Sequence, residues 1–187
     1  PTAIHRIVEW ARSRESRVVC ICNAHSTVTA TADSRFFRAV DECDMATPDG
    51  APVAWMISRL RQLPQERING PDLMWRLLER VSGTEHSVFL YGGKQSTLDR
   101  LVAVLGARFP SVRIAGAYSP PFRPLTDEED EEVVSMINAS GASILFVGLG
   151  CPKQEIWMMD RRGRIQAVML GVGAAFDYHA GVISRAP

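Results

Sequence analysis

The chain has 187 residues, of which 46% are hydrophobic and 22% are charged, a composition typical of a globular protein with a core of ordinary size. Lys and Arg together number 21, as do Asp and Glu, so the formal net charge is zero and no nucleic-acid partner is indicated. The first residues are predicted to form an amphipathic, charged helix rather than a secretory signal. The apolar runs near 142–150 and 167–176 are too short to span a bilayer.

Short β-like runs alternate with amphipathic helical segments along the whole chain, without internal repeats or low-complexity linkers. Strands are expected over residues 17–22, 44–47, 86–91, 112–117, 144–147 and 166–170. Helices are expected over residues 33–43, after the turn 48–50, over 71–81, up to 108, over 126–140 and over 152–162. This alternation predicts a single α/β domain over residues 1–187, with a Rossmann-like, mostly parallel sheet and helices on both faces.

Two charged segments and the cysteines have structural explanations. Thr126 and Glu129 match a capping box, which places the acidic residues 127–132 in the first helical turns, where the helix dipole favours negative charge. The basic segment 161–164 is interpreted as a solvated helix end, with phosphate or membrane contact as the alternative. The four cysteines are Cys20, Cys22, Cys43 and Cys151. We expect reduced thiols, because no second ligand pair at zinc spacing accompanies them.

The candidate site residues follow the predicted strands. Ligands of parallel α/β sheets bind beyond the carboxyl ends of the strands. In chain order these ends carry Asn23, Asp49-Gly50, Gly92-Gly93, the segment 148–155, and the segment 171–173 followed by Asp177. Glycines at such ends let a ligand approach the backbone, and exposed helix amides can hold an anion such as a diphosphate. The set therefore predicts a phosphate- or nucleotide-binding site.

The segment VGLGCPKQE, residues 147–155, begins like a dinucleotide-binding turn but lacks its third glycine. Pro152 is expected to preorganise the helix start, and Lys153 supplies a cation there. Gln154 can offer a ligand both a hydrogen-bond donor and an acceptor. A purely structural Pro-Lys-Gln-Glu at a helix start is equally compatible with the residues alone.

An ordered set of motifs resembles the bacterial WecG/TagA/CpsF glycosyltransferase family across nearly the whole chain. The motifs are Asn23-Ala24-His25, Thr47-Pro48-Asp49-Gly50, Arg67-Ile68-Asn69-Gly70-Pro71-Asp72-Leu73, Phe89-Leu90-Tyr91-Gly92-Gly93, Ser119-Pro120-Pro121-Phe122, Gly148-Leu149-Gly150-Cys151-Pro152-Lys153-Gln154-Glu155, Gly171-Val172-Gly173-Ala174-Ala175-Phe176-Asp177 and Arg185-Ala186-Pro187. The blocks 152–155 and 171–177 are the most specific of these.

The resemblance implies transfer of a hexose or N-acetylhexosamine from a UDP-sugar to a polyprenyl-diphosphate-linked acceptor. The expected place is the inner face of the cytoplasmic membrane, where the protein would be peripheral and would serve exopolysaccharide, enterobacterial-antigen-like or teichoic acid synthesis. Family members are usually described as inverting, which requires a base for the acceptor hydroxyl and charge stabilisation for the leaving UDP.

The resemblance also suggests roles for individual residues. Asp49 matches the proposed catalytic base, although an Asp in a Pro-Asp-Gly turn can equally be a turn former. Substrate-binding roles are expected for Asn23, Arg67, Gly92, Gly93, Gly150, Lys153, Gln154 and Asp177. No metal or other cofactor is expected, because the chain contains no D-x-D motif of the kind that holds a divalent cation in many sugar-nucleotide enzymes.

The sequence departs from the family in two respects and leaves other readings open. Ile21 and Cys22 stand where family members often have Thr, and the family's basic, aromatic C-terminal appendage is expected to be absent after Pro187. A non-catalytic nucleotide-binding module is the main alternative, and a homo-oligomer remains a candidate assembly. A nicotinamide-dependent oxidoreductase is disfavoured by the missing third glycine, and a serine hydrolase by the lack of G-x-S-x-G.

Overall fold

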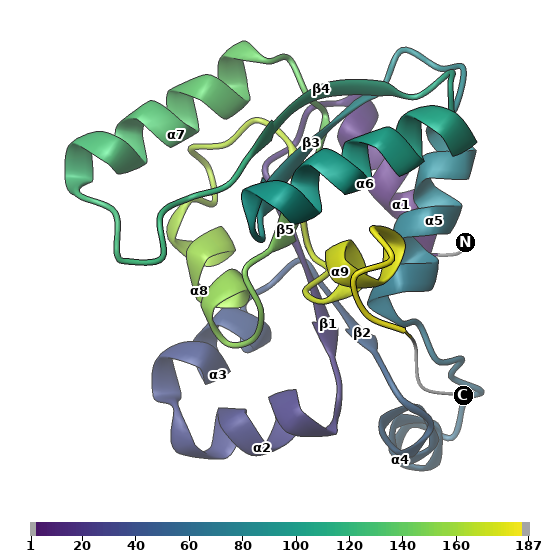
Figure 1. The fold of residues 1–187 in the computed structure, drawn as a ribbon. Helices are drawn as coiled ribbons and strands as arrows, with labels where there is room; N and C mark the ends of the chain where they lie inside the picture. Colours follow the sequence, from purple (N-terminus) through teal and green to yellow (C-terminus); the bar gives the residue numbers. More distant parts are fainter. Residues whose placement is uncertain (1–2, 185–187) are drawn as a thin grey trace.

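A six-stranded parallel sheet forms the centre of the computed structural model, which describes residues 3–184 (Figure 1). The strands are β1 (Arg17–Cys22), β2 (Met45–Pro48), β3 (Ser87–Gly92), β4 (Arg113–Tyr118), β5 (Ile144–Gly148) and β6 (Val168–Gly171). The helices are α1 (Ala3–Arg12), α2 (Ala24–Ala32), α3 (Ser34–Asp41), α4 (Ala51–Arg61), α5 (Gly70–Val81), α6 (Gln95–Arg108), α7 (Asp127–Ala139), α8 (Lys153–Asp160) and α9 (Ala175–His179).

The strand order is β2-β1-β6-β5-β3-β4, and every pairing is parallel. Parallel neighbours must be joined by crossovers, which the intervening helices supply. The predicted α/β class, with a Rossmann-like sheet and helices on both faces, is therefore confirmed. All the carboxyl ends of the strands consequently lie along one edge of the sheet.

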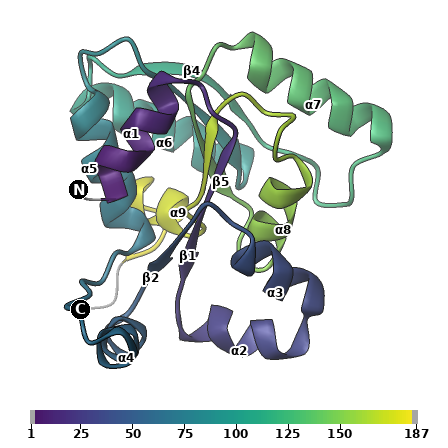
Figure 2. The ribbon, with the colours of Figure 1, turned by 180° about the vertical axis from the view of Figure 1, so that it is seen from behind.

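Alternate side chains of each strand enter two separate cores. On one face, Val19, Leu90 and Phe146 pack against α1, α5, α6 and α9. On the other face, Cys20 and Leu145 pack against α7 and α8. The central strands β1, β3, β5 and β6 are mostly buried on both sides, which explains their largely apolar sequences, whereas the edge strands β2 and β4 are less buried. Seen from behind in Figure 2, the two helix groups again lie on opposite sides of the sheet.

Local sequence signals account for several helix starts. The capping box of α7 is formed as predicted: Thr126 Oγ1 accepts a hydrogen bond from the Glu129 N–H at 3.2 Å, and Glu129 accepts one from the Thr126 N–H at 2.9 Å. Asn69 caps α5 by accepting from the Asp72 N–H at 2.8 Å. Pro152, expected inside α8, instead directly precedes it.

Two helices were missed from the sequence. Helix α2 has a weakly periodic sequence, AHSTVTATA, in which only Ser26 is buried. The sequence therefore has no apolar stripe that would predict this helix. Helix α9 has only five residues. The four cysteines are free, as expected. The motif at 185–187 lies outside the described residues, and none of the helices within 3–184 is long and apolar enough to cross a membrane.

Candidate functional site

Three glycine-containing turns meet at the carboxyl edge of the sheet. They follow β3, β5 and β6, which are adjacent in the sheet. The turn after β5 leads to α8 on one face, whereas the turns after β3 and β6 lead to α6 and α9 on the other face. A crevice for ligands forms where neighbouring connections diverge in this way. The structure thus brings Gly92, Gly93 and Gly150 together at a topological switch point.

The glycines in these turns have different physical reasons. A Cβ on Gly92 would lie 2.7 Å from the carbonyl carbon and oxygen of Gly148, and a Cβ on Gly148 would lie 2.6 Å from the Phe176 ring. These two positions therefore serve close packing of the turns themselves. Gly150 differs, because its φ of +79° disfavours side chains although nothing lies within 4 Å of the added Cβ position. Gly150 is partly exposed, so the open space beside its Cα leaves room for a ligand.

Gln154 has a different surrounding from the one expected. Its side chain is buried, and its Oε1 accepts hydrogen bonds from the N–H of Gly150 at 3.2 Å and of Gly173 at 3.1 Å. Its Nε2 donates to Glu155 Oε1 at 2.9 Å. The carboxamide therefore joins the turn after β5 to the turn after β6. A direct contact between Gln154 and a ligand stays a prediction.

Glu155 is the most deeply buried acid near the site, with 1% of its surface exposed. Its Oε2 has no hydrogen-bond partner among the described residues. Burial raises the pKa of this carboxyl above its usual value, although the hydrogen bond from Gln154 opposes the shift. Burial likewise raises the pKa of the Cys22 thiol to about 12, so this neighbouring cysteine is no thiolate nucleophile at neutral pH.

A second group of predicted residues lies at the ends of β1 and β2. The Asp49 N–H donates to the Cys22 carbonyl at 2.7 Å, so Asp49 is fixed beside the end of β1. Asn23 follows Cys22 and uses its side chain to cap α2, accepting from the Ser26 N–H at 3.0 Å. The loop after α4 joins the group through the Ile68 N–H, which donates to the Pro48 carbonyl at 2.8 Å. Arg67, the preceding residue, is exposed.

Two further predicted residues border the glycine turns. Asp177, in α9, accepts a hydrogen bond from Thr97 Oγ1 at 3.2 Å and so links α9 to the first turn of α6. Lys153 is exposed at the start of α8, and its Nζ lies 5.6 Å from the centre of the Phe122 ring. The loop that carries Phe122 is anchored at the crevice, because Ser119 Oγ donates to the Gly93 carbonyl at 2.7 Å.

Lys94 is a candidate that the sequence reasoning missed. It is exposed, follows Gly93 directly, and occupies the N-cap of the 14-residue helix α6. No side-chain hydrogen bond caps this helix, so its first amides remain available to an anion. A Gly-Gly-Lys run between a buried strand and a helix is the signal that could have revealed it.

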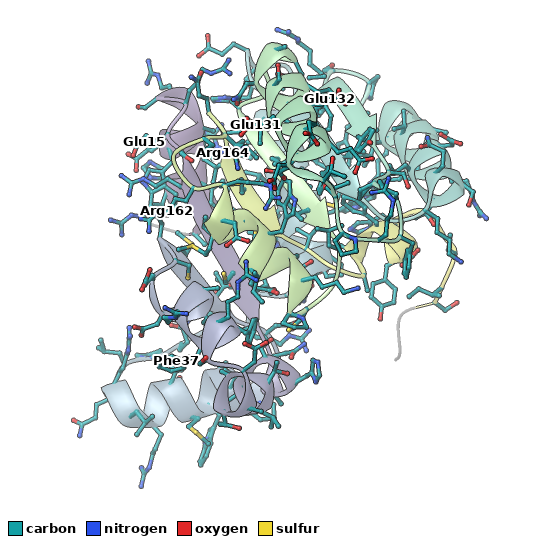
Figure 3. The ribbon with its side chains drawn as sticks, turned by 90° about the vertical axis from the view of Figure 1, so that its left-hand side faces the viewer. Glu15, Phe37, Glu131, Glu132, Arg162 and Arg164 are labelled. Atoms are coloured by element: carbon teal, nitrogen blue, oxygen red, sulfur yellow. The ribbon has the colours of Figure 1, made fainter. Side chains whose placement is uncertain are left out.

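The basic segment 161–164 is occupied by internal ion pairs. Arg161 and Arg164 both pair with Asp130, and Arg164 also pairs with Glu131 at 2.7 Å. Arg162 pairs with Asp44 at 2.7 Å. Figure 3 shows Arg164 beside Glu131, on the face formed by α7 and the loop after α8. Because these arginines are paired within the fold, the structural interpretation of the segment is favoured over phosphate binding.

Two hollows of the surface are lined by α2, α3 and α8 rather than by the glycine turns. One of about 510 Å³ lies between α2 and α3 and includes Cys22, and one of about 280 Å³ lies between α3 and α8. Neither is lined by a glycine turn or a lysine. The candidate site is placed at the turns because the candidate residues after β3, β5 and β6 lie there, with Lys94 and Lys153 at the helix starts that follow. No group of three or more potential metal ligands occurs among residues 3–184.

Glycine turns and two lysines, Lys94 and Lys153, at the carboxyl edge of a Rossmann-like sheet are typical of the class of α/β proteins that bind a nucleotide or another phosphate-bearing ligand. The comparison with protein families agrees with this class. All of residues 1–187 match the Glycosyl transferase WecG/TagA/CpsF family, and the chain belongs to that family.

Two curated relatives were found in Staphylococcus aureus, in strains NCTC 8325 and COL. Each is an N-acetylglucosaminyldiphosphoundecaprenol N-acetyl-beta-D-mannosaminyltransferase. Each is 29% identical to this chain over 177 residues, which cover 94% of this chain and 68% of the relative.

We predict that Gln154→Ala lowers the stability of the fold. The change leaves the Gly150 N–H without its partner and opens a cavity, at a cost of about 1–3 kcal/mol for the unsatisfied group alone. The melting temperature is expected to fall by roughly 2–4 °C for each kcal/mol of lost stability. Gln95→Ala, which removes an exposed amide bonded to Asp99, is the control and is expected to melt near the parent. Equal melting of both variants would show that the buried carboxamide does not hold the turns.

We predict that Glu155→Gln stabilises the protein at neutral pH. Because burial raises the folded-state pKa of Glu155, the folded chain binds this proton more tightly than the unfolded chain does. The protonated Glu155 carboxyl therefore stabilises the folded state. This contribution is complete below the usual glutamate pKa of 4.5 and is lost as the pH rises through the folded-state pKa. Melting curves at pH 7.5 should show a gain on the order of a few degrees. The gain should shrink near pH 4, while the exposed Glu79→Gln control shows neither effect.

Proposed function

We propose that the chain transfers a sugar from a UDP-sugar to a hydroxyl of a polyprenyl-diphosphate-linked acceptor at the membrane surface. The observation that carries the proposal is the match of the whole chain to the glycosyltransferase family, together with glycine turns at the switch point of the sheet. N-acetylmannosamine is the first donor sugar to test, because the staphylococcal relatives transfer an N-acetyl-β-D-mannosaminyl group to a lipid-linked diphosphate.

In the proposed mechanism the acceptor oxygen attacks the anomeric carbon of the donor as the bond to the UDP oxygen breaks, with inversion. Asp49 takes the proton of the acceptor hydroxyl, since it is partly exposed beside the end of β1 at the carboxyl edge. The departing diphosphate gains negative charge and needs fixed positive groups near it. We propose that Lys94 and Lys153, with the first amides of α6, supply them.

The remaining predicted residues act on the shape of the site in this proposal. Gln154 holds two turns in register, and Asp177 holds α9 against α6. Asn23 fixes the start of α2 beside Asp49, and Arg67 offers a cation at the far side of the same group. Transfer is proposed to need no metal ion, since these cationic side chains can carry the electrostatic stabilisation.

A donor screen tests the proposal directly. The purified chain is incubated with UDP-sugars and a short-chain lipid-diphosphate acceptor, with and without a metal chelator, and UDP release is measured. We expect UDP release with at least one UDP-sugar, insensitivity to the chelator, and tighter binding of UDP than of NAD by calorimetry. Tight UDP binding without transfer to any acceptor would instead favour a non-catalytic nucleotide-binding module.

We predict that Asp49→Asn impairs transfer without impairing binding. The amide keeps the size of the side chain but cannot accept the proton, so transfer should fall by about two to four orders of magnitude, the usual contribution of a general base. UDP affinity and melting temperature should stay near those of the parent. Asp41→Asn, which changes an exposed carboxylate of α3, is the matched control. Parental turnover by Asp49→Asn would mean that another group is the base.

A further inference from the structure

Helix α4 presents large apolar side chains to the outside. Trp55 is 65% exposed, Met56 55% and Leu60 77%, and Leu63 just beyond the helix is 66% exposed. The only buried residue of α4 is Ala54. Met56 and Leu60 are one helical turn apart, Trp55 is next to Met56, and Leu63 lies past the helix end. Figures 1 and 2 show α4 at the lower end of the molecule, away from the two packed helix groups.

The charges on and after this helix are mainly positive. Arg59 lies within α4, Arg61 ends the helix, and Arg67 follows in the next loop; all three are exposed. Helix α4 itself contains no acidic residue, and Glu66 is the single acid between it and Arg67. None of the three arginines forms an ion pair within residues 3–184, in contrast to those of the segment 161–164.

The place of α4 connects this surface with the proposed chemistry. Its N-cap is Gly50, the residue after Asp49, and the loop that follows it returns to the Pro48 carbonyl through Ile68. Whatever α4 rests on is therefore close to the carboxyl edge of the sheet. Exposed apolar side chains, Trp among them, accompanied by cationic residues are typical of helices that lie in the interface of an anionic bilayer.

We infer that α4 is an interfacial helix that docks the protein on an anionic lipid surface, with Trp55, Met56, Leu60 and Leu63 inserted among the headgroups. Arg59 and Arg61 then face lipid phosphates. The inference rests on the proposed function, because it places the base beside the surface from which a lipid-linked acceptor hydroxyl would be presented. Charge selects a bilayer as the occupant, since a second copy of α4 would bring like-charged arginines together.

Binding to vesicles tests this inference. The 187-residue chain is sedimented with phosphatidylglycerol-containing vesicles and with neutral phosphatidylcholine vesicles. We expect binding to the anionic vesicles that weakens with salt. Trp55→Gln combined with Leu60→Gln should weaken it by about tenfold or more, because two inserted apolar groups are lost. Met136→Gln, which changes a 41% exposed residue of α7, is the matched apolar control and should bind like the parent.

A charge pair extends the test. Arg59→Gln should weaken binding to the anionic vesicles severalfold, whereas Arg113→Gln, at the amino end of β4, should not. Melting curves check the fold of each variant. If the double variant melts lower than the parent, Leu63→Gln, which lies outside the helix, takes its place.

Several outcomes would overturn the inference. The parent chain could fail to bind anionic vesicles, or the double variant could bind as tightly as the parent. Loss of self-association by the double variant, measured by light scattering, with unchanged vesicle binding would assign α4 to a contact between copies. Transfer to a soluble acceptor without a lipid tail should be the same in parent and double variant. Vesicle binding through α4 without any transfer would reject the proposed function and leave the docking surface standing.

Discussion

The buried carboxamide of Gln154 is the interaction on which the candidate site depends. One oxygen accepts from the backbone amides of Gly150 and Gly173, which belong to turns that leave neighbouring strands toward opposite faces of the sheet. Turns of this kind have few apolar contacts of their own, so a shared acceptor fixes their separation. The nitrogen of the same side chain is held in turn by Glu155, whose burial opposes its ionisation. The side chain that fixes the separation of the two turns is thus itself held by Glu155, a buried acid whose ionised form is unfavourable.

Much of the fold could be predicted because burial leaves a clear pattern in the sequence. A parallel strand covered on both faces is a continuous apolar run, so the central strands β1, β3, β5 and β6 could be recognised, whereas the edge strands β2 and β4 carry this signal more weakly. Parallel alternation then placed every strand end on one edge, which brought the glycine turns together in the prediction as they are in the structure. Helices with strong caps, such as α7, could be predicted for a second reason, because the residues that begin them form a local pattern.

Other features depend on long-range packing that the residue pattern does not show. Helix α2 carries alanine and threonine without an apolar stripe, so only the capping box between Asn23 and Ser26 marks it. The direction of the Gln154 side chain depends on residues beyond the following strand β6: Gly171, where a Cβ would lie 3.0 Å from Gln154 Nε2, and Gly173, whose N–H donates to its Oε1. A polar residue at a helix start is as compatible with a ligand as with the backbone until that room is known.

Although the net charge is zero, the cations that have no ion pair are unevenly distributed over the molecule. Arginines of the segment 161–164 are matched by acids of α7 and by Asp44, so these cations are already paired within the fold. Lys94, Lys153 and the arginines of α4 form no ion pair within residues 3–184, and they lie on segments that follow the carboxyl ends of the strands. Under the proposed function one such edge meets two kinds of phosphate, the diphosphate of the donor and that of the lipid-linked acceptor. A surface that also inserts apolar side chains into the bilayer would hold both near Asp49, because the acceptor diphosphate cannot leave the headgroup layer to which its lipid confines it.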